Sequence, residues 1–217
     1  MAKHDEGLVI KAPNLMIGRF RIVGTAPYVQ HKFSAKAQAM IIATQEAGTV
    51  ARTKKKREAK DFDAVYQGAQ HVAHEGWAGI PAPAFRNAMI SACRLIGFKM
   101  TLAKLSVFIL PDGFDADDGT PLVQISKGQP HKHVGYARNA TGVIDIRARP
   151  MWDPGWEATV RCRWDADQFC ASDVANLLTR AGAQVGIGEG RADSKNSAGV
   201  GWGSFDVEPI VDLGGAP

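Results

Sequence analysis

Hydrophobic and polar residues alternate along several short stretches of the chain, and this alternation predicts β-strands. The period is two residues, so one face of each strand is apolar and the other polar. It predicts strands at residues 17–25, 143–149, 157–164 and 202–207. The first of these strands has a basic face formed by Arg19 and Arg21, and Pro27 stops it.

An acidic turn with a strand on each side follows in the middle of the chain. Residues 104–110 form an apolar run, residues 112–120 are rich in aspartate, and residues 121–126 are apolar again. We interpret this unit as a β-hairpin with a solvated tip. The aspartates lack the spacing of a calcium-binding loop.

A second hairpin is predicted from two alternating stretches, residues 143–149 and 157–164. Residues 150–155, which contain proline and glycine, supply the turn between them. Residues 127–141, which precede this hairpin, have no periodicity and are predicted to be irregular.

Helical periodicity is clearest in two places. A stripe of apolar residues follows prolines 81 and 83 and ends before Gly97; it comprises Phe85, Met89, Ala92, Cys93 and Ile96. A second stripe predicts a helix at residues 173–184 with Ser172 as its N-cap. Residues 34–74, rich in Ala, Gln, Lys and Glu, predict two more helices separated by Gly48.

The order of these elements predicts the fold class. Without the long helical stretch and one extra hairpin, the order is β-α-β-β-α-β, the ferredoxin-like (RRM-like) unit. We therefore predict an α+β fold with a single domain over residues 1–217 and a helical insertion at residues 34–76. Helices cover one face of such a sheet, and RNA-recognition modules bind with the other face.

Composition narrows the class of protein. With 217 residues, 45% hydrophobic and 22% charged, the chain can bury a core, which excludes disordered, collagen-like and disulfide-dense chains. The net charge of +4 is concentrated in residues 52–60, which carry +5, so the remaining residues sum to −1. Such a patch favours contact with phosphates or an anionic surface, and a solvated helix face is the alternative.

The cellular compartment is predicted from what the sequence lacks. Its three cysteines, Cys93, Cys162 and Cys170, form no CxxC pair and lie in apolar patterns. The sequence contains no apolar stretch long enough to span a membrane and no secretory signal. We therefore expect a cytoplasmic protein with reduced, buried thiols and no membrane contact.

Glycine is concentrated between residues 182 and 203. Two dense clusters, 186–191 and 199–203, flank a polar centre. Residues without a Cβ allow backbone amides to approach a phosphate or a neighbouring helix closely, and Arg191 and Lys195 can neutralise charge there. The segment follows a helix and precedes a strand, which excludes a dinucleotide fingerprint. A loop that only packs the helix on the sheet is the alternative.

These residues resemble a known family. The pattern G-I-G-E-G-R, a polar spacer and G-V-G-W-G-S-F, between the last helix and the last strand, is similar to the C-terminal glycine-rich loop of the RAMP superfamily, proteins that process or coat CRISPR RNA. Residues 79–89 (GIPAPAFRNAM) resemble the family's turn into its first helix, with Arg86 at the basic position. Residues 82–84 and Asn87 depart from the small residues and glycines usual there.

The resemblance implies a ferredoxin-like core, RNA or single-stranded DNA as ligand, and head-to-tail assembly as a homo-oligomer, with other effector subunits as partners. It also implies that the insertion at residues 34–76 is a thumb that wedges into the nucleic acid. Some members cleave RNA through one aspartate near the insertion, and Asp61 and Asp63 are the nearest candidates. No motif fixes either, so we predict a non-catalytic backbone subunit, encoded by a cell, a phage or a mobile element.

The predicted interface combines basic side chains with the glycine-rich loop. Interleaved cations and aromatic rings suit single-stranded nucleic acid. The predicted nucleic-acid-binding residues are Arg19, Arg21, Arg52, Lys54, Lys55, Lys56, Arg57, Lys60, Arg86, Gly188, Gly190, Arg191, Lys195, Gly199, Gly201 and Trp202. Aromatic residues in the same segments, among them Trp77, Trp156 and Trp164, are either stacking platforms or core residues.

Two other function classes stay open. A phage virion or assembly protein would use the basic helix and the glycine-rich loop as subunit contacts. A metal-dependent RNA nuclease would use histidines and aspartates. His71 and His74 would share one face of a helix, and His131 and His133 one face of a strand, so the four could bind zinc if the segments met. Alternatively, His71 and His131 could act as general acid and base. We predict no cofactor and assign no metal site.

Overall fold

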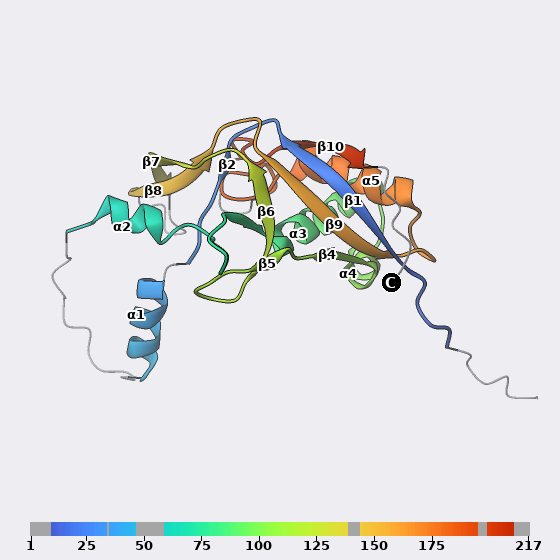
Figure 1. Ribbon diagram of the computed structural model, residues 1–217, viewed down its shortest axis with the longest axis horizontal. Helices are drawn as coiled ribbons and strands as arrows, with labels where there is room; N and C mark the ends of the chain where they lie inside the picture. Colours follow the sequence, from blue (N-terminus) through green and yellow to red (C-terminus); the bar gives the residue numbers. More distant parts are fainter. Residues whose placement is uncertain (1–9, 34, 47–58, 139–143, 195–198, 211–217) are drawn as a thin grey trace, which may run out of the picture.

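The computed structural model describes residues 10–33, 35–46, 59–138, 144–194 and 199–210 (Figure 1). Over these residues the fold is α+β. The strands are β1 (Leu15–Gly24), β2 (Tyr28–Val29), β3 (Gly79–Pro81), β4 (Val107–Leu110), β5 (Gly113–Phe114), β6 (Pro121–Lys127), β7 (His131–Arg138), β8 (Ile144–Trp152), β9 (Glu157–Asp165) and β10 (Phe205–Ile210). The helices are α1 (Ala35–Glu46), α2 (Phe62–Gln67), α3 (Ala82–Ala92), α4 (Met100–Ser106) and α5 (Ala171–Arg180), with a 3₁₀ turn η1 (Cys93–Ile96) and a π turn η2 (Ala181–Val185).

The main sheet is built around β1 and β9. β1 lies between β10 and β9, and all of these pairs are antiparallel. The other edge of β9 is shared by two strands: β4 pairs with residues 161–164, and β6 pairs near residues 157 and 158. β3 and β5 then pair with β6. The strand order is therefore β10-β1-β9-β6-β3, with β4 beside β6 on β9.

A smaller sheet has the order β2-β8-β7. β7 and β8 form a long hairpin with His131 opposite Met151 and Arg138 opposite Ile144. The link from the main sheet to β2 is tight because Gly24 lies against Trp156, where a Cβ would come within 2.0 Å of the indole nitrogen. That nitrogen donates a hydrogen bond of 3.0 Å to the carbonyl of Ala26.

The core lies between the main sheet and helices α3 and α5. The alternation of β1 and β9 places their even-numbered side chains inside, including Ile22 and Trp164. From α3, Phe85 and Met89 are fully buried, and Leu178 of α5 meets the same cluster. Burial of each large apolar side chain contributes about 1.5–3 kcal/mol, so this interface holds the helices on the sheet.

Both predicted amphipathic helices are confirmed, with corrected ends. α3 begins after Pro81, and its 3₁₀ extension ends at Gly97, which has a positive φ of 69°. α5 begins at residue 171, and its N-cap is Cys170 rather than Ser172. Asp173 accepts a hydrogen bond of 2.9 Å from the Cys170 amide, which places the cap two residues earlier than the sequence suggested.

Both predicted hairpins are wrong. β4 and β6 do not pair with each other, because each pairs with β9; the acidic turn instead joins the short strand β5 to β6. β8 pairs with β7 and β2, and β9 pairs with β1. Residues 131–138, predicted to be irregular, form β7. Residues 104–106, predicted to start a strand, belong to α4. Strand alternation does not reveal which partner a strand takes.

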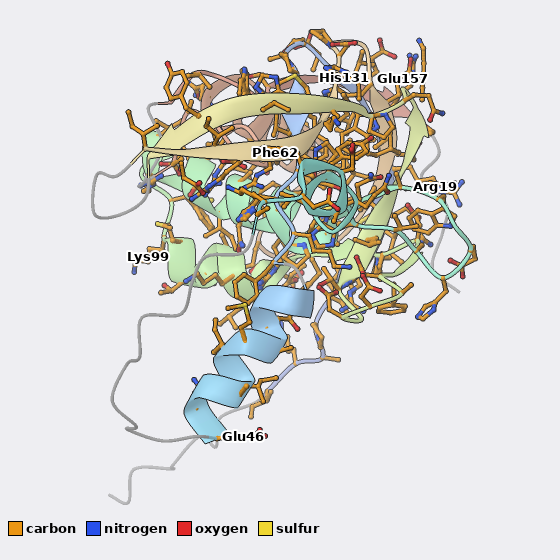
Figure 2. The ribbon with its side chains drawn as sticks, turned by 90° about the vertical axis from the view of Figure 1, so that its left-hand side faces the viewer. Arg19, Glu46, Phe62, Lys99, His131 and Glu157 are labelled. Carbon is orange, nitrogen blue, oxygen red and sulfur yellow. The ribbon has the colours of Figure 1, made fainter. Side chains whose placement is uncertain are left out.

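The predicted helical stretch contains two described helices, α1 and α2. Figure 2 shows α1 projecting from the rest of the structure, with Glu46 at its outer end. Asp61 is the N-cap of α2, and its carboxylate accepts hydrogen bonds from the amides of Asp63 and Ala64; Gly68 is the C-cap. α2 packs against β8, and Lys60 just before it pairs with Asp145 of β8 at 2.8 Å. No helix among the described residues is long and apolar enough to span a bilayer.

Candidate functional site

The glycine-rich segment after α5 folds back on β2 and on itself. The amide of Glu189 donates to the carbonyl of Val29 at 2.9 Å, and the amide of Gly203 donates to that of Pro27 at 2.7 Å. The amide of Ile187 donates to the carbonyl of Gly203 at 3.0 Å and closes the loop. The loop is therefore a hydrogen-bonded wall beside β2.

The glycines of this wall have packing roles. A Cβ on Gly188 would lie 2.5 Å from the carbonyl oxygen of Val29, and one on Gly190 would lie 2.5 Å from the ring of Trp202. Both residues also have positive φ angles, 76° and 78°, which favour glycine. Gly199 and Gly201 share this backbone conformation farther along the loop. Loop packing therefore accounts for the glycines at 188 and 190, and ligand contact there remains a prediction.

A cleft of about 1420 Å³ lies beside this wall. One side is formed by α3 and the glycine-rich loop, another by residues 133–136 of β7, and His31 and His71 line it as well. The rings of His133 and Trp202 meet edge to face, 5.7 Å apart, where the hairpin approaches the loop. Small-molecule sites usually measure about 300–1,000 Å³, so this cleft has room for an extended ligand.

The carboxylates that line the cleft are paired with arginines. Glu189 lines the cleft and pairs with Arg149 at 2.7 Å and with Arg147 at 4.0 Å. Asp193 pairs with Arg94 at 2.5 Å. Burial and the neighbouring Arg149 hold the pKa of His31 below its ordinary value, so this ring is neutral at pH 7. The acidic residues of the cleft are thus matched by arginines.

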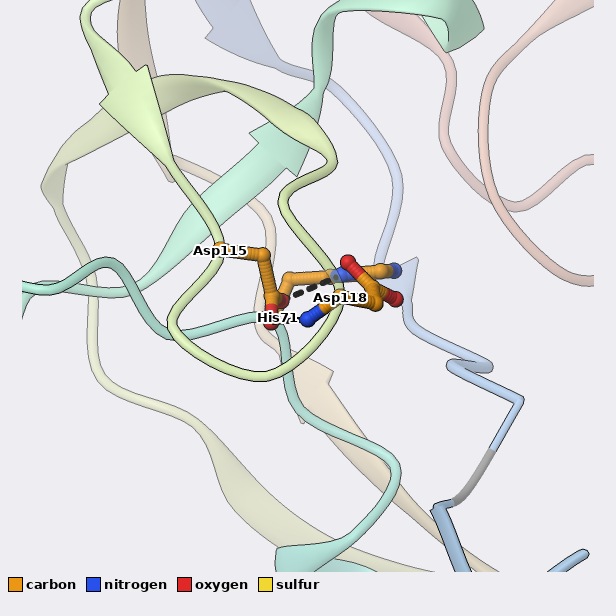
Figure 3. Close-up of side chains that lie close together, drawn as sticks. All are labelled: His71, Asp115 and Asp118. Carbon is orange, nitrogen blue, oxygen red and sulfur yellow. Dashed lines mark hydrogen bonds and ion pairs between the residues drawn. The ribbon is translucent and has the colours of Figure 1, made fainter. Parts of the chain in front are cut away.

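A buried charge cluster adjoins the cleft at His71 (Figure 3). Asp115 is fully buried, and one of its carboxylate oxygens accepts a hydrogen bond of 2.5 Å from Lys32, whose side chain is only 4% exposed. The other carboxylate oxygen lies 2.8 Å from Nδ1 of His71. Lys32 also reaches Asp117 at 2.7 Å. The cluster ties the segment after β2 to the acidic loop.

The electrostatics of this cluster favour its charged form. Burial of Asp115 opposes ionisation, but hydrogen bonds from Lys32, from the amide of Asp117 and from His71 outweigh it and hold the pKa of Asp115 below its ordinary value. Burial likewise opposes the charge on Lys32, and its bonds to Asp115 and Asp117 raise its pKa. A buried ammonium and a buried carboxylate therefore stabilise each other.

The same cluster is the group of described residues that could hold a metal ion. One atom each of His71, Asp115 and Asp118 lies within 4.8 Å of the others. Both oxygens of Asp115, however, already receive a donor, from Lys32 and from His71. A metal ion bound here would lie close to the Lys32 ammonium, whose positive charge opposes it, so the cluster fits an oriented histidine better than a metal.

The predicted solvated tip of the acidic turn is wrong at Asp115, since this residue is buried. The predicted helix through His71 and His74 is also wrong: α2 ends at Gln67, and Val72 and Ala73 form isolated β-bridges with Ala78 and Asp115. His131 and His133 do share a strand, β7. The four-histidine site does not form: the group of described residues that could hold a metal ion includes one histidine, His71, together with Asp115 and Asp118.

The predicted arginines that the structure describes fall in three different places. Arg19 and Arg21 lie on the face of the main sheet opposite the helices, and Arg21 pairs with Glu157 at 2.9 Å and with Glu208. Arg86 donates to the backbone carbonyls of Val107 and Lys104, so it joins α3 to β4. Arg191 lines the cleft and donates to the carbonyl of Gly188 at 3.0 Å.

Several predicted site residues lie outside the described residues; they are Arg52, Lys54, Lys55, Lys56, Arg57 and Lys195. Lys60, next to the basic run, is described and pairs with Asp145. The structure therefore brings Arg191, Gly188, Gly190 and Trp202 to one cleft, and it keeps the described basic residues 19, 21, 60 and 86 apart from that cleft.

Most aromatic residues considered as stacking platforms belong to the core. Trp156 and Trp164 are fully buried, and Trp77 is half-buried. Tyr136, which the sequence interpretation left in an irregular segment, is 80% exposed and lines the cleft. Its neighbours at 134 and 146 are apolar and exposed too. Residues 131–136 (HKHVGY) do not alternate between apolar and polar, so the sequence carries no clear signal that Tyr136 lies on a strand. Of the thiols, Cys93 and Cys162 are buried, and the prediction of a buried Cys170 is wrong.

Comparison with known proteins adds no evidence on the function of this site. The sequence matches no protein-family model and no curated protein. The resemblance to the RAMP superfamily therefore rests on residues 79–89 and 186–205, which lie at the start of α3 and between α5 and β10.

Proposed function

We propose that the protein binds single-stranded nucleic acid, RNA or DNA, in the cleft between the glycine-rich loop, α3 and the β7–β8 hairpin. The observation that carries this proposal is the cleft itself, whose volume of about 1420 Å³ suits an extended ligand. Arg147 and Arg191 supply cations, and the exposed ring of Tyr136 supplies a stacking surface. Each stacked base contributes about 1–3 kcal/mol.

The strand order supports a ferredoxin-like core as part of the same proposal. β10, β1, β9 and β4 are neighbours in that order, and α3 and α5 connect β1 to β4 and β9 to β10. This arrangement corresponds to a β-α-β-β-α-β unit in which β5, β6, β7 and β8 are additions between β4 and β9. With the glycine-rich loop before β10, it supports a relationship to the RAMP superfamily. On that relationship we propose a non-catalytic, cytoplasmic subunit that assembles head-to-tail along the strand.

The test uses two substitutions of one residue. Tyr136→Ala removes the stacking ring, whereas Tyr136→Phe keeps the ring and removes only the hydroxyl. Binding of fluorescein-labelled oligo(U) and oligo(dT) is measured by anisotropy as salt is raised. We expect Tyr136→Ala to weaken binding roughly tenfold or more and Tyr136→Phe to bind like the unaltered protein. Equal affinities for all three proteins would contradict binding in this cleft.

A second candidate function, RNA cleavage, is favoured by the pair of Asp115 and His71. The carboxylate binds Nδ1 of His71 at 2.8 Å and thereby leaves Nε2 as the nitrogen available to a substrate. Nε2 would take the proton of a ribose 2′-hydroxyl, whose oxygen attacks the adjacent phosphorus. The 5′-oxygen would leave with a proton from His133, which lines the same cleft. The products would be a 2′,3′-cyclic phosphate and a 5′-hydroxyl.

Cleavage is tested by incubating labelled RNA and DNA oligonucleotides with the protein in the presence of a chelator. We expect cleavage of RNA only, because DNA lacks the 2′-hydroxyl, and we expect His71→Ala to abolish it. Intact RNA after long incubation would leave the non-catalytic proposal in place. Cleavage that the chelator stops would instead indicate a metal-dependent nuclease.

A further inference from the structure

The face of the main sheet opposite α3 and α5 carries a group of arginines. The alternation of β1 and β9 buries their even-numbered side chains in the core, so the odd-numbered side chains point to the other face. On this face lie Arg19 and Arg21 from β1 and Arg161 and Arg163 from β9. Figure 2 shows Arg19 pointing outward at the edge of the structure. This face lies on the other side of the sheet from the α3 wall of the cleft.

The arginines are placed against the preference of an antiparallel sheet. Arg19 and Arg161 are directly opposite each other in the register of β1 and β9. Like charges in directly opposite positions destabilise a sheet. The strand pair therefore gains nothing from this arrangement by itself, and a ligand that neutralises both charges would stabilise it.

Acidic neighbours neutralise only part of this face. Arg21 is held by Glu157 and Glu208, and Arg161 lies 3.2 Å from Asp112. Within the described ranges of the chain, neither Arg19 nor Arg163 has an acidic partner. Positive charge therefore remains at Arg19, across the strand pair from Arg161, and at Arg163, two residues along β9.

Packing fixes the direction of these side chains but does not satisfy all their donors. The guanidinium carbon of Arg163 lies 5.1 Å from the ring centre of Phe108, which is opposite it on β4. The Nε atoms of Arg161 and Arg163 are buried and have no hydrogen-bond partner among the described residues. Neighbouring atoms cover both Nε atoms, so an external ligand would reach only the solvent-exposed parts of these half-buried side chains.

We propose that Arg19, Arg161 and Arg163 form a second nucleic-acid contact, separate from the cleft, that holds phosphates of a single strand. Arg161 and Arg163 are two residues apart on one strand, a separation of about 7 Å. Arg19 lies beside them on the next strand. The three charges therefore form an L-shaped group, about 5 Å apart across the strands and about 7 Å apart along β9, which can contact more than one phosphate of a strand.

The test combines Arg19→Gln and Arg163→Gln in one protein. Neither residue has an ion pair to lose among the described residues, so the change leaves no carboxylate unpaired. Arg180→Gln is the matched control, because Arg180 is an exposed arginine on α5, on the other side of the sheet. The probes are fluorescein-labelled oligo(U) and oligo(dT) of about fifteen nucleotides, titrated at several salt concentrations from about 50 mM upward.

We expect the double variant to bind roughly tenfold more weakly at low salt, and the slope of log affinity against log salt to shrink by about 1.4, since each lost phosphate contact removes about 0.7. Arg180→Gln should change neither value. The urea midpoint of Arg19→Gln should equal or exceed that of the unaltered protein, because the charge opposite Arg161 is gone. A merely structural arginine would lower that midpoint instead.

Two results would overturn the inference. If the double variant keeps full affinity and slope while Tyr136→Ala loses affinity, the arginine face is no binding site and the cleft proposal stands. If the unaltered protein binds neither oligonucleotide at about 50 mM salt, both proposals fail together.

Discussion

Replacement of Lys32 by methionine tests the buried charge cluster most directly. Lys32 and Asp115 are 2.5 Å apart, and their side chains are 4% and 0% exposed. At that separation, with an effective dielectric constant of about 20, their attraction is about 7 kcal/mol before the cost of desolvation. Methionine keeps most of the length of the side chain but leaves the Asp115 carboxylate without its cation. Loss of one partner of a buried pair typically costs about 3–5 kcal/mol, and we expect that loss at pH 7.

The matched control is Lys132→Met. Lys132 pairs with Asp63 at the same distance, 2.5 Å, but both side chains are exposed, 39% and 80%. Exposed pairs contribute about 0–1 kcal/mol. The free energy of unfolding is measured by urea titration followed by fluorescence of the buried tryptophans. Equal losses for Lys32→Met and Lys132→Met would refute the argument from burial.

The pH dependence separates charge from packing. The folded-state pKa of Asp115 is lowered, so its contribution to stability is present above the unfolded pKa of about 3.9 and is lost as the pH falls through the folded pKa. Without Lys32, burial raises the pKa of Asp115 and protonation relieves the unpaired charge. The cost of Lys32→Met should therefore shrink between pH 7 and pH of about 4. A cost that stays constant over this range would mean that Lys32 acts through packing alone.

Three further predictions concern the loop, the core and the thiols. Gly203→Ala should destabilise the protein far more than Gly201→Ala, because both residues have positive φ but only Gly203 would place a Cβ 1.8 Å from the Ile187 oxygen; equal urea midpoints would contradict this. Gly24→Ala should quench or shift tryptophan fluorescence and lower the thermal midpoint, since its Cβ would overlap the Trp156 indole. Cys170 should react with a thiol reagent in the folded protein while Cys162 does not, because Cys162 is buried and desolvation raises its pKa to about 12; two or more thiols modified at native speed would argue against this burial.

Local patterns predicted much of the secondary structure but not the pairing of strands. The stripes on α3 and α5 and the alternation of β1 and β9 are fixed by short-range periodicity, and the structure confirms them. β4 and β6 share one edge of β9, and nothing in their own residues indicates this. Pairing depends on how the whole sheet buries its apolar face. Two strands that follow each other in the sequence, such as β4 and β6, therefore need not form a hairpin.

The candidate site was predicted only in part, for a similar reason. The glycine clusters marked the loop beside the cleft, because glycine is concentrated there in the sequence itself. Asp115 looked like one of several aspartates in a solvated turn. Its cation, Lys32, is 83 residues away in the sequence, and a lone lysine gives no sign that it will be buried. Tyr136 is not predicted from the sequence, because residues 131–138 show no alternation that would indicate β7.

The buried polar groups beside the cleft fix the positions of the segments around His71. Gln30 is buried and joins three elements: its amide nitrogen donates to Gly79 and to Tyr28, and its oxygen accepts from the amide of His71. Lys32, two residues later, ties the same segment to Asp115, which in turn holds the His71 ring. A buried ion pair adds little stability compared with apolar packing, but it fixes geometry, because each partner is costly to misplace. The cluster therefore sets the position of His71 in the cleft. If the protein binds RNA as proposed, a Lys32→Met variant that stays folded should show a changed affinity for labelled oligo(U), and an unchanged affinity would contradict a role for His71 in binding.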